Sequence, residues 1–144
     1  MTISDQQFKN LPHKAQGYEP WHNGQEIMPG YKPDYVLKGD NHYIILESEN
    51  NTNRKMFVGC LMKAAYFLQE ERTGFLVIVL HEFDNTKINQ IRDHLKPYYQ
   101  WIKRAHLTNM SQVLLIRDED YCIGDKGCLR IDSEEFLEKA ERIA

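Results

Sequence analysis

Three acidic residues stand at the ends of two adjacent segments that have the pattern of β-strands. Asp34 lies near the start of the first segment, PDYVLK, and Glu47 and Glu49 close the second, HYIILESE, with the turn signal GDN between them. If Asp40 and Asn41 are the central residues of a tight hairpin turn, Asp34 lies directly across from Glu47. Glu49 then shares a face with Glu47, because strand side chains alternate between the two faces.

Three carboxylates on one patch repel one another unless a positive charge neutralises them. A divalent cation does so, and a ligand set made only of oxygen atoms suits Mg²⁺, with Mn²⁺ as a substitute. The pattern therefore predicts a metal site formed by Asp34, Glu47 and Glu49. Each feature alone is common on a solvated strand face, so the prediction depends on their combination.

The segment after the hairpin is predicted to be a helix that carries two lysines. Residues 54–71 have apolar residues at helical spacing, asparagines of NNTN are available as caps, and Gly74 is expected to end the helix. Lys55 and Lys63 fall within one stripe, nearly opposite the apolar stripe. That apolar stripe consists of Phe57, Leu61, Ala64, Ala65 and Leu68. Both lysines are expected at an edge of the helix contact, and its position relative to the carboxylates depends on packing.

The remaining pattern predicts an α/β fold. Residues 1–30 are expected to be an irregular arm, apart from a short helix opened by Ser4. The runs FLVIVL and QVLLIR are typical of strands buried on both faces, with a helix kinked or broken at Pro97 between them and a capped helix, SEEFLEKAERIA, at the end. We therefore expect one domain over residues 1–144, with a mixed central sheet that contains the β-hairpin and a βαβ unit and is flanked by helices.

The composition is that of an ordinary globular protein, with 144 residues, 42% hydrophobic and 27% charged. The formal net charge of -3 argues against coating nucleic acid through bulk positive charge, but metal-binding carboxylates are themselves negative, so a nuclease is not excluded. The sequence shows neither a membrane-length apolar run nor a signal-peptide stretch, and we expect a cytoplasmic protein. Cys60, Cys122 and Cys128 are expected to be reduced and structural.

Other polar and aromatic residues are expected to have structural roles. His81 and Glu82 follow FLVIVL and are assigned to a loop or a helix cap, although they could touch the site. The acidic run at residues 118–120 is assigned to a solvated loop. Tyr98 and Trp101 are expected to pack in the core, with basic side chains along their edge.

The acidic motif resembles that of a known nuclease superfamily. Pro33-Asp34, twelve intervening residues, and then Glu47-Ser48-Glu49 at the end of an apolar strand followed by a helix are similar to the PD-(D/E)xK superfamily, which includes many restriction endonucleases. The resemblance covers about residues 29–82 and implies a restriction-endonuclease-like fold.

In that superfamily the aspartate and the first acidic residue bind the metal, which here implies Asp34 and Glu47, while the last position is usually lysine. Glu49 occupies that last position, and the resemblance leaves Lys55 or Lys63 to supply the missing charge. The family often has a further acidic ligand on an N-terminal helix, for which Glu19 and Glu26 are weak candidates.

The resemblance implies a metal-dependent DNA endonuclease that hydrolyses phosphodiester bonds with Mg²⁺, in a restriction or related DNA-processing system. The lysine would balance charge on the phosphate oxygens, and Glu49 could bind a second ion or orient the nucleophile. Two alternatives remain open: a DNA-binding or regulatory member of the same fold that no longer cuts, and an assembly subunit whose acidic hairpin is incidental. Because one active site per chain must act on two strands, the expected partners are DNA and either a second copy or another subunit.

Overall fold

The computed structural model describes residues 3–122 and 127–143. Its strands are β1 (Glu19–His22), β2 (Tyr35–Gly39), β3 (His42–Glu49), β4 (Thr73–Leu80), β5 (Met110–Arg117) and β6 (Glu141–Ile143). Its helices are α1 (Asp5–Lys9), α2 (Arg54–Phe67), α3 (Ile88–Arg104), α4 (Asp118–Tyr121) and α5 (Glu134–Lys139).

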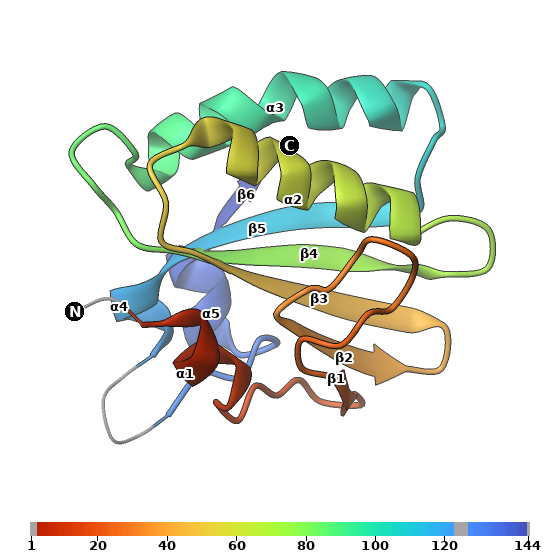
Figure 1. Ribbon diagram of the computed structural model, residues 1–144, viewed down its shortest axis with the longest axis horizontal. Coiled ribbons are helices and arrows are strands. Elements are labelled where there is room, and N and C mark those ends of the chain that lie inside the picture. Colours follow the sequence, from red (N-terminus) through yellow and green to blue (C-terminus); the bar gives the residue numbers. More distant parts are fainter. Residues whose placement is uncertain (1–2, 123–126, 144) are drawn as a thin grey trace.

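The strands form one mixed sheet in the order in which they occur along the chain. The central strands β3, β4 and β5 are parallel, whereas β1, β2 and β6 join by antiparallel pairing. The two crossover helices α2 and α3 cover one face of this sheet, and α1, α4 and α5 lie on the other (Figure 1). The expected α/β class, with a mixed sheet, a hairpin and a βαβ unit flanked by helices, is confirmed.

The hairpin of β2 and β3 has the predicted register. Tyr35 pairs with Leu46 and Gly39 pairs with His42, which leaves Asp40 and Asn41 at the turn. Asp40 has φ +54°, a left-handed conformation that aspartate tolerates better than most residues. The chain therefore reverses where the sequence indicates, and Asp34, one residue before β2, lies opposite Glu47.

Helix α2 begins as expected, because the Asn53 side chain accepts a hydrogen bond from the Lys55 backbone N–H at 3.0 Å. The predicted apolar stripe is buried against the sheet.

The expectation that Gly74 ends the helix is wrong, since α2 ends at Phe67 and Gly74 lies in β4. Gly74 has φ +148°, and a Cβ atom there would lie 1.9 Å from the Tyr43 carbonyl oxygen. Glycine is thus required by the close approach of β3 and β4.

Helix α3 runs through Pro97 as one helix, so of the predicted kink or break the break does not occur. Proline removes the hydrogen bond to the carbonyl of Asp93, four residues earlier. Both residues are exposed, so water can satisfy that carbonyl, and buried residues on the other face, such as Leu95 and Tyr99, hold the helix against the sheet.

Both ends of the chain contribute a strand that the sequence did not indicate. The supposed irregular arm contains β1, which pairs with β2, and the supposed terminal helix stops at Lys139 and is followed by β6, which pairs with β5. The helix starts at the two ends are as expected, because Ser4 and Ser133 cap α1 and α5. Strands of three or four residues are too short to show a period and form only because a neighbouring edge supplies hydrogen bonds.

Two apolar layers hold the fold, one on each face of the sheet. Tyr99 and Ile102 of α3 are buried in the first layer, but Tyr98 and Trp101 are exposed, which corrects their expected core packing. These two side chains lie on the outer face of α3, away from the sheet. Within the described ranges, no helix combines the length and apolar character needed to cross a membrane.

Candidate functional site

A pocket of about 320 Å³ lies at the carboxyl end of β3, between the start of α2 and the N-terminal segment. It brings together all five residues singled out from the sequence. These are Asp34, Glu47, Glu49, Lys55 and Lys63. The pocket is also lined by Asp5, Tyr31, Lys32 and Cys60, which the sequence did not indicate as site residues. Four carboxyl groups and three lysines therefore share one hollow.

Asp34 and Glu47 are held together by reciprocal bonds to the backbone. The Asp34 backbone N–H donates to Glu47 Oε1 at 3.1 Å, and the Ser48 backbone N–H donates to Asp34 Oδ2 at 2.8 Å. Each carboxylate thus accepts one backbone hydrogen bond at the open end of the hairpin, just beyond the last paired residues, Tyr35 and Leu46. The hairpin register, set by the turn at Asp40, is what places the two carboxylates side by side.

Glu49 lies on the same face of β3 but has a different partner. The Cys60 thiol, on α2, donates to Glu49 Oε2 at 3.3 Å. Cys60 is 9% exposed, and its pKa is raised by burial and then by Glu47 and Glu49. The thiol therefore stays protonated and acts as a donor that fixes the Glu49 side chain toward α2.

The electrostatics of the pocket disfavour ionised carboxyl groups. Burial, followed by the neighbouring charge of Asp34, raises the pKa of Glu47 to about 8. The pKa values of Asp34 and Glu49 are also raised, in both cases mainly by burial. Carboxylates gathered at low polarity without a sufficient counter-charge have such pKa values, and a bound cation would lower them again.

Tyr31 faces the same groups with an unpaired hydroxyl. The residue is 3% exposed. Its buried hydroxyl has no hydrogen-bond partner among the described residues. Burial, followed by the charge of Glu47, raises the pKa of this phenol, so it remains a donor. A buried unpaired hydroxyl is unfavourable for folding and is unusual in native proteins.

The two candidate lysines differ in their relation to the acids. Lys63 donates from Nζ to the Gly30 carbonyl oxygen at 3.4 Å, and its charge lowers the pKa of Glu47. Lys55 lines the pocket from the first turn of α2. Both side chains are exposed at the rim. Lys63 is therefore the lysine whose charge acts on the Glu47 carboxylate.

The weak candidates for a further acidic residue lie elsewhere. Glu19 is in β1 and lines a different hollow with Lys38, and Glu26 Oε2 accepts a hydrogen bond from the Gly30 backbone N–H at 3.2 Å. Asp5, in the first turn of α1, lines the pocket instead, and its charge contributes to the raised pKa values of Asp34 and Glu49. The capping box at Ser4 indicated the helix, but nothing in the sequence placed that helix beside β3.

The donor types fit a hard divalent cation, because the acidic side chains offer only oxygen atoms. Their arrangement is not a closed ligand set: across the described parts of the chain, no group of three His, Cys, Asp or Glu side chains is already arranged to hold a metal ion. The reason is visible in the contacts, since Asp34 and Glu47 bond to backbone N–H groups and Glu49 bonds to a thiol. Asp34 and Glu47 form the pre-positioned pair, and Glu49 would have to release Cys60 to join them.

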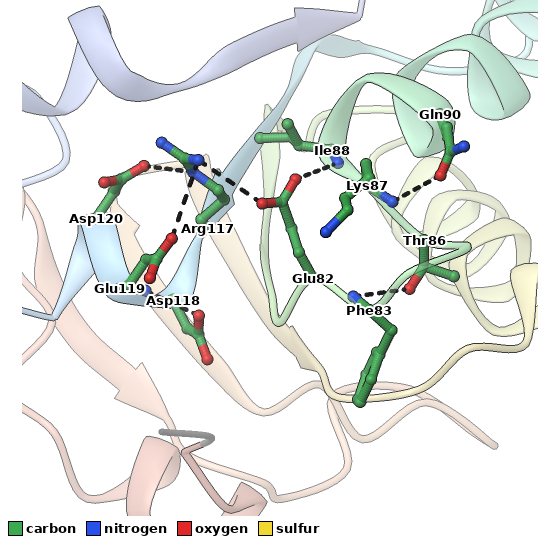
Figure 2. Close-up of polar contacts among 10 residues, drawn as sticks. All are labelled: Glu82, Phe83, Thr86, Lys87, Ile88, Gln90, Arg117, Asp118, Glu119 and Asp120. Atoms are coloured by element: carbon green, nitrogen blue, oxygen red, sulfur yellow. Dashed lines mark hydrogen bonds and ion pairs between the residues drawn. The ribbon is translucent and has the colours of Figure 1, made fainter.

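A second polar cluster lies at the carboxyl ends of β4 and β5 (Figure 2). Arg117 contacts Asp120 Oδ2 at 2.7 Å and lies 3.7 Å from Glu82 Oε1 and 3.9 Å from Glu119 Oε1. The other oxygen of Glu82 accepts a hydrogen bond from the Ile88 backbone N–H at 2.8 Å, which satisfies a free donor at the start of α3. The capping role expected for Glu82 is confirmed.

The acidic run at 118–120 is not the solvated loop that was expected. It forms α4, and Asp118 is 5% exposed, with Oδ2 accepting from His81 Nδ1 at 3.0 Å and Oδ1 accepting from the Glu119 backbone N–H. Arg117 neutralises the two neighbouring acids, as Figure 2 shows. The contacts of this cluster are therefore those of a helix cap and an ion-pair network.

Comparisons with protein-family models, with curated proteins and with solved structures gave no significant match.

Proposed function

We propose that the chain is a metal-dependent DNA endonuclease that hydrolyses phosphodiester bonds at the pocket formed by Asp34, Glu47 and Glu49. The observation that carries this proposal is the convergence in one pocket of three carboxyl groups from the hairpin, Asp34, Glu47 and Glu49, and two lysines from the following helix. Acidic groups suit a divalent cation and basic groups suit a phosphate, and phosphodiester hydrolysis requires both in one place.

The chain's own groups have separate tasks in this proposal. Asp34 and Glu47 would hold Mg²⁺ or Mn²⁺, because their carboxylates are already side by side. When bound, the cation supplies Lewis acidity to the phosphate and lowers the pKa of bound water. Lys63 and Lys55, at the rim, would attract the phosphate and balance the negative charge that develops on its oxygens.

The fold supports the same proposal, although it carries less weight. The hairpin, the helix α2 and the parallel strand β4 occur in the order that the resemblance to PD-(D/E)xK nucleases implies, with the acidic residues on β3 and at the entrance to β2. Asp5 supplies an acidic group from an N-terminal helix, which is the type of element from which the family often adds a ligand.

The test is a cleavage assay on plasmid, linear and single-stranded DNA with Mg²⁺ or Mn²⁺. We expect Asp34→Asn to abolish cleavage while keeping the fold, because an asparagine oxygen can still accept the bond from Ser48. The matched control is Asp84→Asn, an exposed residue outside the pocket, which should cleave like the parent. Cleavage by Asp34→Asn at the parental rate would refute the assignment.

Variants of Glu49 distinguish an active enzyme from a member of the same fold that no longer cuts DNA. If Glu49 binds an ion or orients water, Glu49→Gln should lose most activity while retaining metal at Asp34 and Glu47. If the parent binds DNA in Ca²⁺ but does not cut in Mg²⁺ or Mn²⁺, the chain is the DNA-binding or regulatory alternative. Weak cleavage gained by Glu49→Lys would then show that the missing lysine is the cause.

Cutting both strands of DNA requires two such pockets, so the proposed assembly on DNA is a homodimer or a complex with a partner subunit. Size-exclusion chromatography with light scattering, on protein alone and on a short duplex in Ca²⁺, measures this directly. A monomer in both conditions would argue against the homodimer.

A further inference from the structure

Two cysteines face each other on the sheet face opposite α2 and α3. Cys122 follows α4, and Cys128 is the second residue of the next described segment; their sulfur atoms are 3.5 Å apart. Both side chains are partly buried against the same apolar layer. The sequence indicated only isolated, reduced cysteines, because five residues separate them and neither lies in a periodic segment.

The backbone holds this pair in a geometry that suits a disulfide. Cys122 and Cys128 are partners in an antiparallel bridge, and the Leu129 backbone N–H donates to the Tyr121 carbonyl oxygen at 3.0 Å. A bond between the flanking residues marks a pair that is not itself hydrogen-bonded, for which Cα atoms lie about 4.5 Å apart and side chains lie closest. Disulfides occur at Cα separations of about 4.4–6.8 Å, so the sulfur atoms need to approach by only roughly 1.5 Å.

The surroundings distinguish the two thiols. Either sulfur can donate in the contact between Cys122 and Cys128, and His13 and Tyr121 lie beside the pair. The contact between the two sulfur atoms lowers the pKa of Cys128 and raises that of Cys122. The thiolate of either cysteine could attack the oxidant, and the lower pKa of Cys128 favours attack by Cys128.

We propose that Cys122 and Cys128 are a reversible redox modification site, which closes to an intramolecular disulfide with a small disulfide oxidant of the glutathione type. The Cys128 thiolate attacks one sulfur of the oxidant and releases one thiolate, forming a mixed disulfide. The Cys122 thiol gives its proton to the released thiolate, and its sulfur then displaces the second thiolate, which takes from solvent the proton that Cys128 gave up on ionising. Two electrons and two protons pass to the oxidant, which leaves as two thiols.

The fold also shows what the modification would constrain. Tyr121 donates its hydroxyl proton to His13 Nδ1 across 2.6 Å, and His13 Nε2 donates to the Phe8 carbonyl oxygen across 2.7 Å, given that this carbonyl can only accept. The residue next to the cysteine pair is therefore bonded through His13 to α1. The inference itself does not depend on the proposed nuclease activity.

The experiment equilibrates the full reduced chain with mixtures of glutathione and glutathione disulfide, blocks remaining thiols, and measures intact mass and linked peptides. We expect a form two hydrogens lighter, with Cys122 linked to Cys128 and Cys60 still free, and full reversal by dithiothreitol. Cys122→Ser should instead stop at a mixed disulfide with one glutathione, whereas the matched control Cys60→Ser should still form the internal disulfide.

The same equilibrium measured in urea shows whether the fold creates the site. We expect the folded chain to form the internal disulfide with an equilibrium constant larger than that of the unfolded chain by about tenfold or more, or about 30 mV in potential. An equal or smaller constant in the folded chain would overturn the proposal, as would a disulfide that includes Cys60 or joins two chains.

Discussion

Replacing Glu47 with glutamine tests the electrostatics of the pocket without any assumption about the substrate. Glutamine has the same shape and can still accept the hydrogen bond from the Asp34 backbone N–H. It lacks the charge that burial and Asp34 disfavour. In metal-free buffer we therefore expect Glu47→Gln to be more stable than the parent at neutral and alkaline pH, although a residue of the proposed site has been removed.

The size and sign of the effect follow from the pKa of Glu47, which is raised from 4.5 in an ordinary environment to about 8 in the folded protein. Below about pH 4.5 the carboxyl is protonated in both the folded and the unfolded chain, and its charge costs nothing. As the pH rises toward about 8, the unfolded chain ionises freely and the folded chain does not, so the parent loses stability. The upper limit is roughly 4–5 kcal/mol at 1.36 kcal/mol per pKa unit, and relaxation of the side chain into the pocket reduces the expected gain of the variant to about 2 kcal/mol.

The assay is urea unfolding of parent and variant with a chelator at several pH values between about 4.5 and 8. The stability difference should be near zero at the acidic end and should grow with pH, while the effects of other titrating groups cancel between the two proteins. Glu71→Gln, an exposed residue outside the pocket, is the control and should show no such trend.

Adding Mn²⁺ or Ca²⁺ should reverse the order of stability, because the cation binds the folded parent better than the variant. At a concentration of about 100 times the dissociation constant, binding adds about 2.7 kcal/mol to the stability of the parent. Parallel stability curves for parent and variant across the whole pH range would refute the electrostatic reasoning. A pH trend without any response to metal would keep the burial of Glu47 and refute its role as a ligand.

Three further sets of substitutions test other parts of the structure. Tyr31→Phe removes a buried unpaired hydroxyl and should raise the unfolding free energy by about 1 kcal/mol, whereas a loss of similar size would show that the hydroxyl has a partner. Gly74→Ala should lower the unfolding free energy by roughly 3 kcal/mol or more, because its Cβ would collide with β3, while Gly59→Ala, which meets open space in α2, should raise it by about 0.5–1 kcal/mol. Lys63→Ala should slow DNA cleavage by about tenfold or more and exceed the effect of Lys55→Ala, with stability changes within about 1 kcal/mol measured in parallel.

The part of the site that lies within one hairpin could be predicted from the sequence. The turn at Asp40 and Asn41 and the two-residue alternation of strands determine which residues face each other over a short stretch of chain. The relation of Asp34 to Glu47 and Glu49 follows from these local rules, as does the buried stripe of α2. The long strands β4 and β5 could also be predicted from the sequence, because strands buried on both faces need continuous apolar runs.

Only the tertiary structure decided which distant residues join that hairpin. Asp5, Tyr31 and Cys60 reach the pocket because α1, the segment before β2 and α2 all pack around the end of β3. The short strands β1 and β6 exist because the sheet has edges to pair with, and the two cysteines meet because Cys122 and Cys128 pair across an antiparallel bridge. Local periodicity specifies the face on which a residue lies within its own element, whereas the side chains that meet it there depend on how separate elements pack, which no short segment of sequence contains.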